Sequence, residues 1–301
     1  MLTLSITYRM KNIALILGLI LLIGIVAFML LRTSAENVTV PADDTLIDDV
    51  VVDTDEIEIP TELEEGEVAP ALPVTELGMS AGGRPIMVHT FGTGRNDILI
   101  VGGMHGAYAP NTTEVAERLI ALAESDPQFV PAGVTLHVVP TLNPDGAALG
   151  TTPAGRFNAN GVDLNRNFDC EWQAEGIWQS QAVSGGSEPF SEPEAAALRS
   201  YVAAIEPVAA VVYYSAAGGV YSSNCRNGVS AETKTLTDVY AQASDYAPFA
   251  EFDFYAITGD AVNWMAKEGV AAISVLMTDY TSPEWEKNRA GLAAVLELYA
   301  E

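Results

Sequence analysis

The chain is 301 residues long and carries 40 acidic against 14 basic side chains, which gives a formal net charge of −26 at pH 7. This balance argues against nucleic acid as a partner, because phosphate backbones are bound by clustered Lys and Arg. The first 73 residues do not have a globular pattern, so we expect one domain of about 230 residues, which is long enough to bury a core.

An uncharged apolar run of 19 residues, at positions 13–31, lies near the start of the chain. A run of this length spans a bilayer as a helix, and it is longer than the apolar region of a cleaved signal peptide, which is the alternative. Residues 1–32 are therefore predicted to be a transmembrane signal anchor. Arg9 and Lys11 precede the run and Arg32 follows it, which favours a single-pass membrane protein with an extracytoplasmic C-terminal domain.

The next segment, residues 33–73, is strongly acidic. Thirteen Asp and Glu residues, and no Lys or Arg, lie between Thr33 and Glu67. Repulsion between like charges keeps such a segment extended, so we predict an acidic disordered stalk that holds the domain off the membrane. Residues 74–301 are then the folded domain.

From about residue 72 onwards, short apolar runs alternate with segments of helical periodicity, which is typical of strand-helix-strand units. Strands are expected at 85–91, 97–102, 134–139, 208–214 and 271–277. Helices are expected at 111–125, 192–205, 232–244, 260–268 and 283–299, and Ser191 with Glu194 is expected to form a capping box at the second of these. The pattern predicts a single α/β domain with a mostly parallel central sheet flanked by helices.

Residues 142–189 form a long stretch rich in Gly, Asn and Ser with little periodicity, and a loop of this length is usually functional. Ligand sites in open α/β sheets lie beyond the carboxyl ends of the strands. The segments found there read GGMHGAYAPNT, NPDG, GVDLNRNF, YYSAAGG and LMTDY. Together they resemble the zinc metallocarboxypeptidase family (carboxypeptidase A-like, peptidase M14) over roughly residues 77–298.

The resemblance assigns substrate-binding roles to several residues. Asn165 and Arg166 match the pair in the family's DxNRN motif that binds the terminal carboxylate of the substrate, and a guanidinium is suited to bidentate pairing with a carboxylate. Arg156 matches the arginine that polarises the scissile carbonyl. Tyr255 matches the mobile substrate tyrosine, and Val262 falls near the specificity position, which implies an uncharged or apolar terminal side chain. The alternative for the two arginines is ion pairing with Asp145, Asp163 or Asp169.

The metal site and the catalytic base depart from the family's pattern. The resemblance implies zinc bound by two His and one Glu, and of these positions His105 alone is filled by a ligand. Three and four residues after it stand Tyr108 and Ala109, and Tyr214 occupies the second histidine position. Leu276 occupies the place of the general-base glutamate, and a leucine cannot take a proton from water. The other histidines, His89 and His137, lie inside predicted strands and are expected to be structural.

The sequence thus predicts a catalytically inactive, degenerate member of the family without a cofactor. It would bind peptide C-termini or small carboxylates through Arg156, Asn165, Arg166 and Tyr255, with His105 a vestigial ligand or a hydrogen-bond donor. The alternative is an active zinc carboxypeptidase with non-standard ligands, for example His105, Tyr214 and Asp279. A third possibility is a scaffold whose surface binds a partner protein.

Two cysteines, Cys170 and Cys225, are expected on the extracytoplasmic side, where thiols oxidise. We predict that they form a disulfide. A structural zinc site needs four closely spaced ligands, and nothing in the sequence supplies the other two.

Overall fold

The computed structural model describes residues 74–300, so the expected signal anchor and acidic stalk lie outside the described residues. Within that described part, no helix combines the length and apolar character that a membrane crossing requires.

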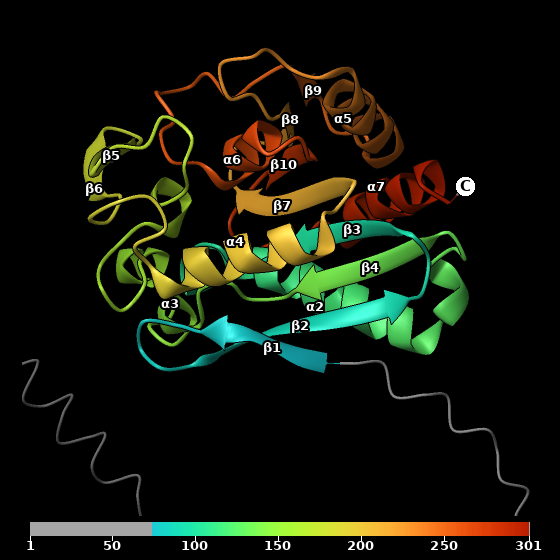
Figure 1. The fold of residues 1–301 in the computed structure, drawn as a ribbon, viewed down its shortest axis with the longest axis horizontal. Helices are drawn as coiled ribbons and strands as arrows, with labels where there is room; N and C mark the ends of the chain where they lie inside the picture. Colours follow the sequence, from blue (N-terminus) through green and yellow to red (C-terminus); the bar gives the residue numbers. More distant parts are fainter. Residues whose placement is uncertain (1–73, 301) are drawn as a thin grey trace, which may run out of the picture. The chain divides into compact units, whose positions relative to one another are not determined.

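An eight-stranded sheet runs through residues 74–300 (Figure 1). Its strands lie in the order β1 (Val74–Met79), β2 (Pro85–Gly92), β4 (Val134–Val139), β3 (Asn96–Val101), β7 (Ala209–Ser215), β10 (Ala271–Met277), β8 (Gly219–Ser222) and β9 (Pro248–Phe249). The four central strands, β4, β3, β7 and β10, are parallel, while β1, β2 and β8 pair antiparallel nearer the edges. The predicted α/β class with a mostly parallel central sheet is confirmed.

The central strands are nearly continuous apolar runs because both of their faces are covered. All seven residues of β10 and all but the last of β7 are buried. The five strands and five helices expected from the sequence are all present, with ends that lie within two residues of the expected positions. Strands β1, β8 and β9 of this sheet were not predicted, nor were β5 (Glu175–Trp178) and β6 (Gln181–Ser184).

Helices cover both faces of the sheet. On one face pack α2 (Pro110–Ser125), α5 (Ala231–Ser244) and α7 (Trp285–Leu298). On the other pack α4 (Pro193–Ile205) and α6 (Ala261–Lys267). Local sequence explains several helix starts: Pro110 occupies the first turn of α2, and the side chains of Ser230 and Asp260 accept backbone N–H groups at the starts of α5 and α6.

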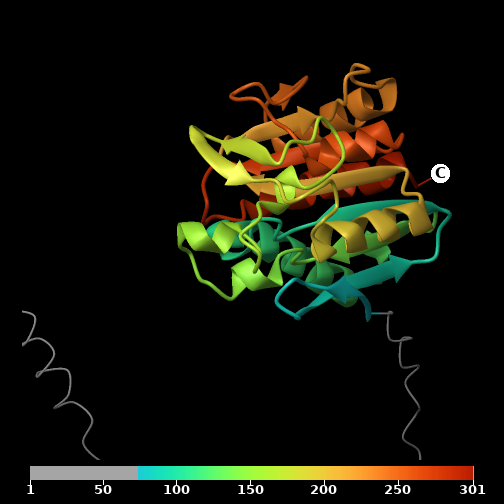
Figure 2. The same cartoon turned by 60° about the vertical axis from the view of Figure 1, so that its left-hand side comes forward.

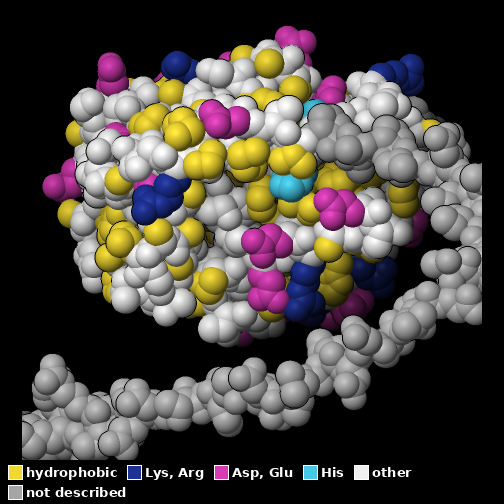
Figure 3. Space-filling model, turned by 90° about the horizontal axis from the view of Figure 1, so that it is seen from below, with side chains coloured by type: hydrophobic (Ala, Val, Ile, Leu, Met, Phe, Trp, Pro, Cys, Tyr) yellow, Lys and Arg dark blue, Asp and Glu magenta, His cyan; other side chains and the backbone are white. Residues whose placement is uncertain are grey.

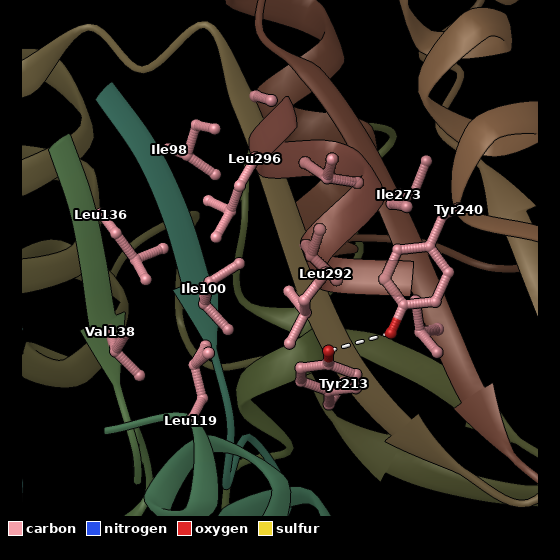
Figure 4. Close-up of a cluster of buried hydrophobic side chains, with 14 of the residues drawn as sticks. Ile98, Ile100, Leu119, Leu136, Val138, Tyr213, Tyr240, Ile273, Leu292 and Leu296 are labelled. Atoms are coloured by element: carbon pink, nitrogen blue, oxygen red, sulfur yellow. Dashed lines mark hydrogen bonds between the residues drawn. The ribbon is translucent and has the colours of Figure 1, made fainter. Parts of the chain in front are cut away.

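The core beneath α2, α5 and α7 is shown in Figure 4, where side chains of β3, β4 and β10 meet Leu119 of α2 and Leu292 and Leu296 of α7. Two buried phenols lie in this core, and their hydroxyls, from Tyr213 and Tyr240, are 2.9 Å apart and hydrogen-bonded. Such pairing avoids the cost of leaving buried polar groups without partners. The core includes residues of β7 and β10, the strands whose carboxyl ends lie at the site.

The capping box expected at the start of α4 is not formed. Glu192 is the N-cap residue, and its side chain makes no capping bond. Glu194 is fully buried and instead accepts the backbone N–H of Ala81 and the side-chain amide of Asn158. These partners, Ala81 and Asn158, are distant in sequence, so the local pattern of Ser191 and Glu194 could not predict them.

Residues 142–189, expected as one long loop, contain α3 (Pro144–Ala147), two 3₁₀ turns (Pro153–Arg156 and Leu164–Arg166) and a hairpin of β5 (Glu175–Trp178) and β6 (Gln181–Ser184). They lie beside the arrowheads of β7 and β4 at the left of Figure 1 and come forward in Figure 2.

On the face drawn in Figure 3, Lys and Arg side chains lie in small separated groups beside Asp and Glu.

Candidate functional site

A cleft of about 780 Å³ lies where the carboxyl ends of β7 and β10 meet the loops of residues 142–189 and 248–260. It brings together the residues that the sequence singled out, although they come from segments far apart in the chain. The lining includes His105, Arg156, Asn165, Arg166, Tyr214, Tyr255, Val262 and Leu276. Tyr108 and Ala109 are not among the lining residues.

Arg166 is held rigidly at this cleft and is only 1% exposed. Its Nε and Nη2 donate to the carbonyl oxygen of Ile177 in β5, at 3.1 and 2.7 Å, and its Nη1 donates to the carbonyl oxygen of Asn165 at 2.6 Å. A guanidinium has five N–H groups, so one remains on each of Nη1 and Nη2. Among residues 74–300 no ion pair includes Arg166. The end of the guanidinium is thus able to receive a carboxylate in bidentate fashion.

Arg156 has a carboxylate partner, as the alternative interpretation of the sequence allowed. Its Nε and Nη2 donate to Oδ2 of Asp163 at 2.9 and 2.7 Å, and its guanidinium carbon lies 4.4 Å from the ring centre of Trp178. Both Arg156 and Asp163 are buried. Since Nη1 makes none of these bonds, Arg156 keeps N–H groups that a ligand carbonyl can accept.

His105 completes this buried cluster through Nε2, which lies 3.2 Å from Oδ1 of Asp163. Burial alone would raise the pKa of Asp163, but the charge of Arg156 and the bond to His105 outweigh it and hold that pKa well below the usual range. Burial, with the charge of Arg156 as the second cause, lowers the pKa of His105 to about 4. Because an ionised carboxylate only accepts, Nε2 carries the imidazole proton and Nδ1 keeps its lone pair.

Asn165 connects three elements rather than presenting a free amide. Its Oδ1 accepts the hydroxyl of Tyr214 at 2.9 Å and the backbone N–H of Ala261 at 3.1 Å, and its Nδ2 donates to Oδ2 of Asp260 at 2.7 Å. Burial raises the pKa of Tyr214 well above its usual value, so the phenol stays protonated and donates. One N–H of the Asn165 amide is left for a ligand.

Tyr255 lies at the aromatic wall of the cleft. Its ring packs edge-on against Phe252, with centroids 5.0 Å apart, and lies 6.0 Å from the guanidinium carbon of Arg166. The resemblance assigned Tyr255 a substrate-binding role together with Asn165 and Arg166, and these three residues line the same cleft.

The two strands that end at the cleft present Tyr214 and Leu276 side by side, because these residues are register partners on β7 and β10. Both are buried, and the ring of His105 lies 5.7 Å from that of Tyr214. These three side chains line the cleft next to one another.

The predicted disulfide between Cys170 and Cys225 is confirmed, with the two Cα atoms 6.0 Å apart. It joins the loop after Arg166 to the loop after β8. Residues next to both cysteines line the cleft, namely Glu171, Asn224 and Arg226, so the disulfide ties two of its walls together.

The model of the zinc carboxypeptidase family, peptidase family M14, matches residues 69–290. The chain belongs to this family. Carboxypeptidase E of Caenorhabditis elegans is 36% identical over 118 residues, which cover 31% of this chain and 24% of that protein. Murein peptide amidase A of Escherichia coli (strain K12) is 35% identical over 130 residues, which cover 40% of this chain and 49% of that protein. The chain therefore matches less than half the length of these curated relatives.

Solved structures of the zinc carboxypeptidase family share the fold. The crystal structure of murein-tripeptide amidase from Escherichia coli O157 has a TM-score of 0.57 at 22% identity, and the match covers 77% of this chain and 94% of that chain. The structure of thrombin activatable fibrinolysis inhibitor has a TM-score of 0.63 at 17% identity, and the match covers 76% of this chain and 68% of that chain. At such identities the likeness establishes architecture, and function has to be argued from the site.

The residues at the zinc carboxypeptidase metal position do not fit a zinc held by two His and one Glu. His105 offers one nitrogen, but the hydroxyl of Tyr214, at the second histidine position, is already donated to Asn165. The ring of Tyr108 packs edge-on against Trp178 and Tyr280, with centroids 5.2 and 4.9 Å away. No group of three His, Cys, Asp or Glu in residues 74–300 is arranged to hold a metal ion.

The non-standard ligand set considered for an active zinc carboxypeptidase is not assembled either. Asp279 is exposed, does not line the cleft, and accepts the backbone N–H groups of Thr281 and Ser282, both at 2.7 Å.

The two histidines outside the site lie in strands, as predicted. His89 is in β2 and His137 in β4, and His137 is bonded to Asp97 at 2.7 Å and to the hydroxyl of Tyr201 at 2.7 Å.

Sequence reasoning missed several cleft residues, chiefly Trp178, Tyr221, Thr258, Asp260 and Ser274. Asp260 was visible only as the start of a helix, and its second task, holding Asn165, depends on a contact 95 residues away in sequence. Trp178 lies in a hairpin that has no strand pattern in the sequence.

Proposed function

We propose that this zinc carboxypeptidase-like domain binds peptide C-termini, or related small carboxylates, without hydrolysing them and without zinc. The observation that carries the proposal is Arg166, a buried guanidinium without an ion-pair partner among residues 74–300, which keeps an N–H on each terminal nitrogen. A buried cation at an open cleft is stabilised by an anion from outside.

The neighbouring groups complete a binding site for a terminal peptide unit. Arg156 offers its remaining N–H groups to the carbonyl of the preceding peptide bond, and Asn165 offers the second N–H of its amide to the carboxylate. His105, expected as a relic or a donor, has its donor turned to Asp163, so Nδ1 offers an acceptor for a ligand N–H. These groups bind and orient a peptide end.

Hydrolysis lacks support at the same site. A water attacking the peptide carbonyl needs a metal or a base to remove its proton, and Leu276 and Tyr214 supply neither. The apolar side chain of Leu276 also makes its part of the cleft less polar, which strengthens an arginine–carboxylate pair.

We also propose that residues 1–32 anchor the chain in a membrane and that the folded domain lies on the extracytoplasmic side. This part follows from the apolar run at residues 13–31 and the acidic segment after it. Fractionation of cells expressing the full chain tests this part, because recovery in the soluble fraction without detergent would contradict an anchor.

The binding proposal is tested with the full chain and peptides of one sequence that end in a free acid or in an amide. We expect the free acid to bind and raise the melting temperature, and the amide to do neither. Arg166→Ala should weaken binding of the free acid by at least about 30-fold, since it removes a buried charge-assisted pair. Arg226→Ala is the matched control, because Arg226 lines the same cleft but is exposed and already paired with Glu171.

Two results would contradict the proposal. Equal binding of acid and amide would favour a scaffold that binds partners through another surface. One zinc per chain together with carboxypeptidase activity, after purification in zinc, would establish the active enzyme instead.

A further inference from the structure

A second cavity, of about 790 Å³, lies between α4 and α6 and is as large as the cleft. We call it the α4–α6 groove, and of the residues described in the structure none lines both cavities. Arg199 and Ala203 lie one turn apart on α4, and Glu206 caps the end of this helix. Trp264 lies on α6, and Glu268 caps the end of that helix. The groove therefore has an arginine part-way along α4 and carboxylates where the two helices end.

The floor of the groove is apolar. The ring of Trp264 packs against those of Phe168 and Phe190, with centroids 5.5 and 5.3 Å away. Phe190 is half-buried and lines the groove together with the buried side chains of Val202 and Val270. Apolar side chains of a ligand can pack on this surface, and the contacts between the rings keep it in place.

Arg199 presents its guanidinium to the groove. The guanidinium carbon lies 4.6 Å from the centre of the Phe190 ring, and the side chain is exposed. No ion pair in residues 74–300 includes Arg199. A guanidinium stacked on an aromatic ring keeps its N–H edge for an anion, and a carboxylate matches that edge with two hydrogen bonds. This part of the groove is suited to a carboxylate.

Two exposed carboxylates lie at the end of the groove, where Glu206 and Glu268 cap α4 and α6. Each stands three residues before Ala209 or Ala271, and these alanines are register partners on β7 and β10, so the two turns enter the sheet side by side. Neither glutamate belongs to an ion pair in residues 74–300. The carboxyl end of a helix carries partial negative charge, which favours a cation there. A positive group from outside would thus be stabilised by both glutamates.

Two residues that line the groove have a left-handed backbone, which glycine adopts at less cost. Phe190 has a φ of 61° and Glu206 a φ of 45°. A glycine at either position would remove the strain, but it would also remove the aromatic ring or the carboxylate. Strained backbone of this kind clusters at binding sites, where the side chain itself has a task. The strain supports a function for both side chains beyond packing.

We propose that the α4–α6 groove binds a short free peptide of two or three apolar residues. Its carboxylate pairs with Arg199, its ammonium group lies between Glu206 and Glu268, and its side chains pack on Phe190. Glu206 is two helical turns beyond Arg199, a distance of about 10.5 Å, and an extended peptide spans roughly 3.5 Å per residue. The ends of a dipeptide or tripeptide therefore reach both charges, whereas the charged groups of a single amino acid lie on one carbon atom. The site is separate from the proposed function, because none of these side chains lines the cleft.

Photo-crosslinking of the unaltered full chain locates the site. The probe is a leucyl dipeptide with both termini free and a diazirine in its second side chain. After irradiation and digestion, we expect mass spectrometry to find label on segments 190–206 or 264–270, and an excess of unlabelled Leu-Leu to reduce it. Label confined to residues of the cleft, or label that Leu-Leu does not reduce, would overturn the proposal.

Calorimetry with matched ligands identifies the groups that bind. Leu-Leu is compared with its N-acetyl derivative, its amide and leucine, in the full chain with Arg166→Ala, where the cation of the cleft is absent. We expect one Leu-Leu to bind per chain. The affinity should be about tenfold lower for each of the other three ligands, because each can form only one of the two charged pairs.

Two sets of substitutions assign the ends of the ligand. Arg199→Gln should lower the affinity for Leu-Leu about tenfold and leave that for the amide unchanged, because the amide has no carboxylate to lose. Glu206→Gln together with Glu268→Gln should lower the affinity for Leu-Leu and leave that for the N-acetyl derivative unchanged. Arg289→Gln is the control, because Arg289 is an exposed arginine on α7 outside the groove and should leave every affinity as it was.

The outcomes of these titrations decide the proposal. If Leu-Leu binds equally well with and without Arg199→Gln, the carboxylate is not held there and the proposal is overturned. An equal loss of affinity for the amide in that variant would also overturn the assignment, because the effect would not depend on a carboxylate. Either result leaves the binding of peptide C-termini at the cleft untouched, since that function is tested by the free acid and the amide in the unaltered chain and in Arg166→Ala.

Discussion

The two sides of the cleft differ in what their side chains can do. The arginine side, made of Arg156, Asp163 and Arg166, keeps buried charges that are held by hydrogen bonds to one another or to the backbone. The strand-end side, made of His105, Tyr214 and Leu276, has one imidazole, one phenol already bonded to Asn165, and one aliphatic side chain.

The comparison indicates that the proposed carboxylate binding and the hydrolysis of a peptide would depend on different parts of this fold. In the proposed function, carboxylate binding uses donors on a loop that is hydrogen-bonded to a hairpin and tied by the disulfide. Hydrolysis would use a few atoms at strand ends, where a single substitution removes a metal donor or a base. The strand-end side can therefore lose its chemistry while the arginine side stays folded.

The largest expected effect comes from restoring the strand-end side. The combined variant Tyr108→Glu, Tyr214→His and Leu276→Glu should take the chain from no bound zinc to about one zinc per chain, because it supplies the family's second histidine and its glutamates beside His105. Metal content after dialysis measures this. Tyr108 is the better site for the ligand glutamate, because Ala109 is 1% exposed and a carboxylate there would enter the core.

Two controls accompany the restored variant. The same three substitutions combined with His105→Ala should bind no zinc, which shows that the ion occupies the intended site. If the triple variant folds but binds no metal, the strand ends differ from the family's geometry in more than these side chains.

A smaller effect concerns the imidazole that links the two sides. The pKa of His105 is about 4 in the folded chain against 6.5 in an ordinary histidine, so between these values the unfolded chain binds more protons. The free energy of unfolding should therefore fall as the pH drops from 6.5 to 4, by about 3 kcal/mol from this residue. Urea denaturation of the unaltered chain and of His105→Gln across this range measures it, because carboxylates that titrate in both chains cancel. Parallel curves would show that His105 is not buried beside Arg156.

The smallest expected effect concerns the hydrogen bond that Tyr214, on the strand-end side, donates to Asn165, the residue before Arg166. Tyr214→Phe removes one hydroxyl and leaves Oδ1 of Asn165 with a single donor, from Ala261. We expect a loss of about 1 kcal/mol in stability and about fivefold weaker binding of a free-acid peptide. Tyr213→Phe, which removes a hydroxyl from the opposite face of the same strand, should cost similar stability and leave peptide affinity unchanged. Equal effects of both variants on affinity would mean that Tyr214 has no special link to Asn165.

Much of the fold was predictable from the sequence because its signals are local. Continuous apolar runs marked the buried central strands, and helical periodicity marked the helices. The structure adds the residues that start three of them, namely Pro110, Ser230 and Asp260. Strands β1, β8 and β9 were not found, because the first is largely exposed and the other two are too short to show a period. The prediction of a capping box was wrong because Glu194 accepts hydrogen bonds from Ala81 and Asn158, which are distant in sequence.

By itself the sequence determined which side chains stand at the strand ends, that the cysteines could pair, and that the loop holding Asn165 and Arg166 resembles a carboxylate-binding motif. The tertiary structure decided how those groups are used. It pairs Asp163 with Arg156 and bonds the amide of Asn165 to Tyr214 and Asp260. It also bonds Arg166 to the carbonyl oxygen of Ile177. The physical reason is that a buried polar group takes whichever partner the packed chain brings near it, and those partners are distant in sequence.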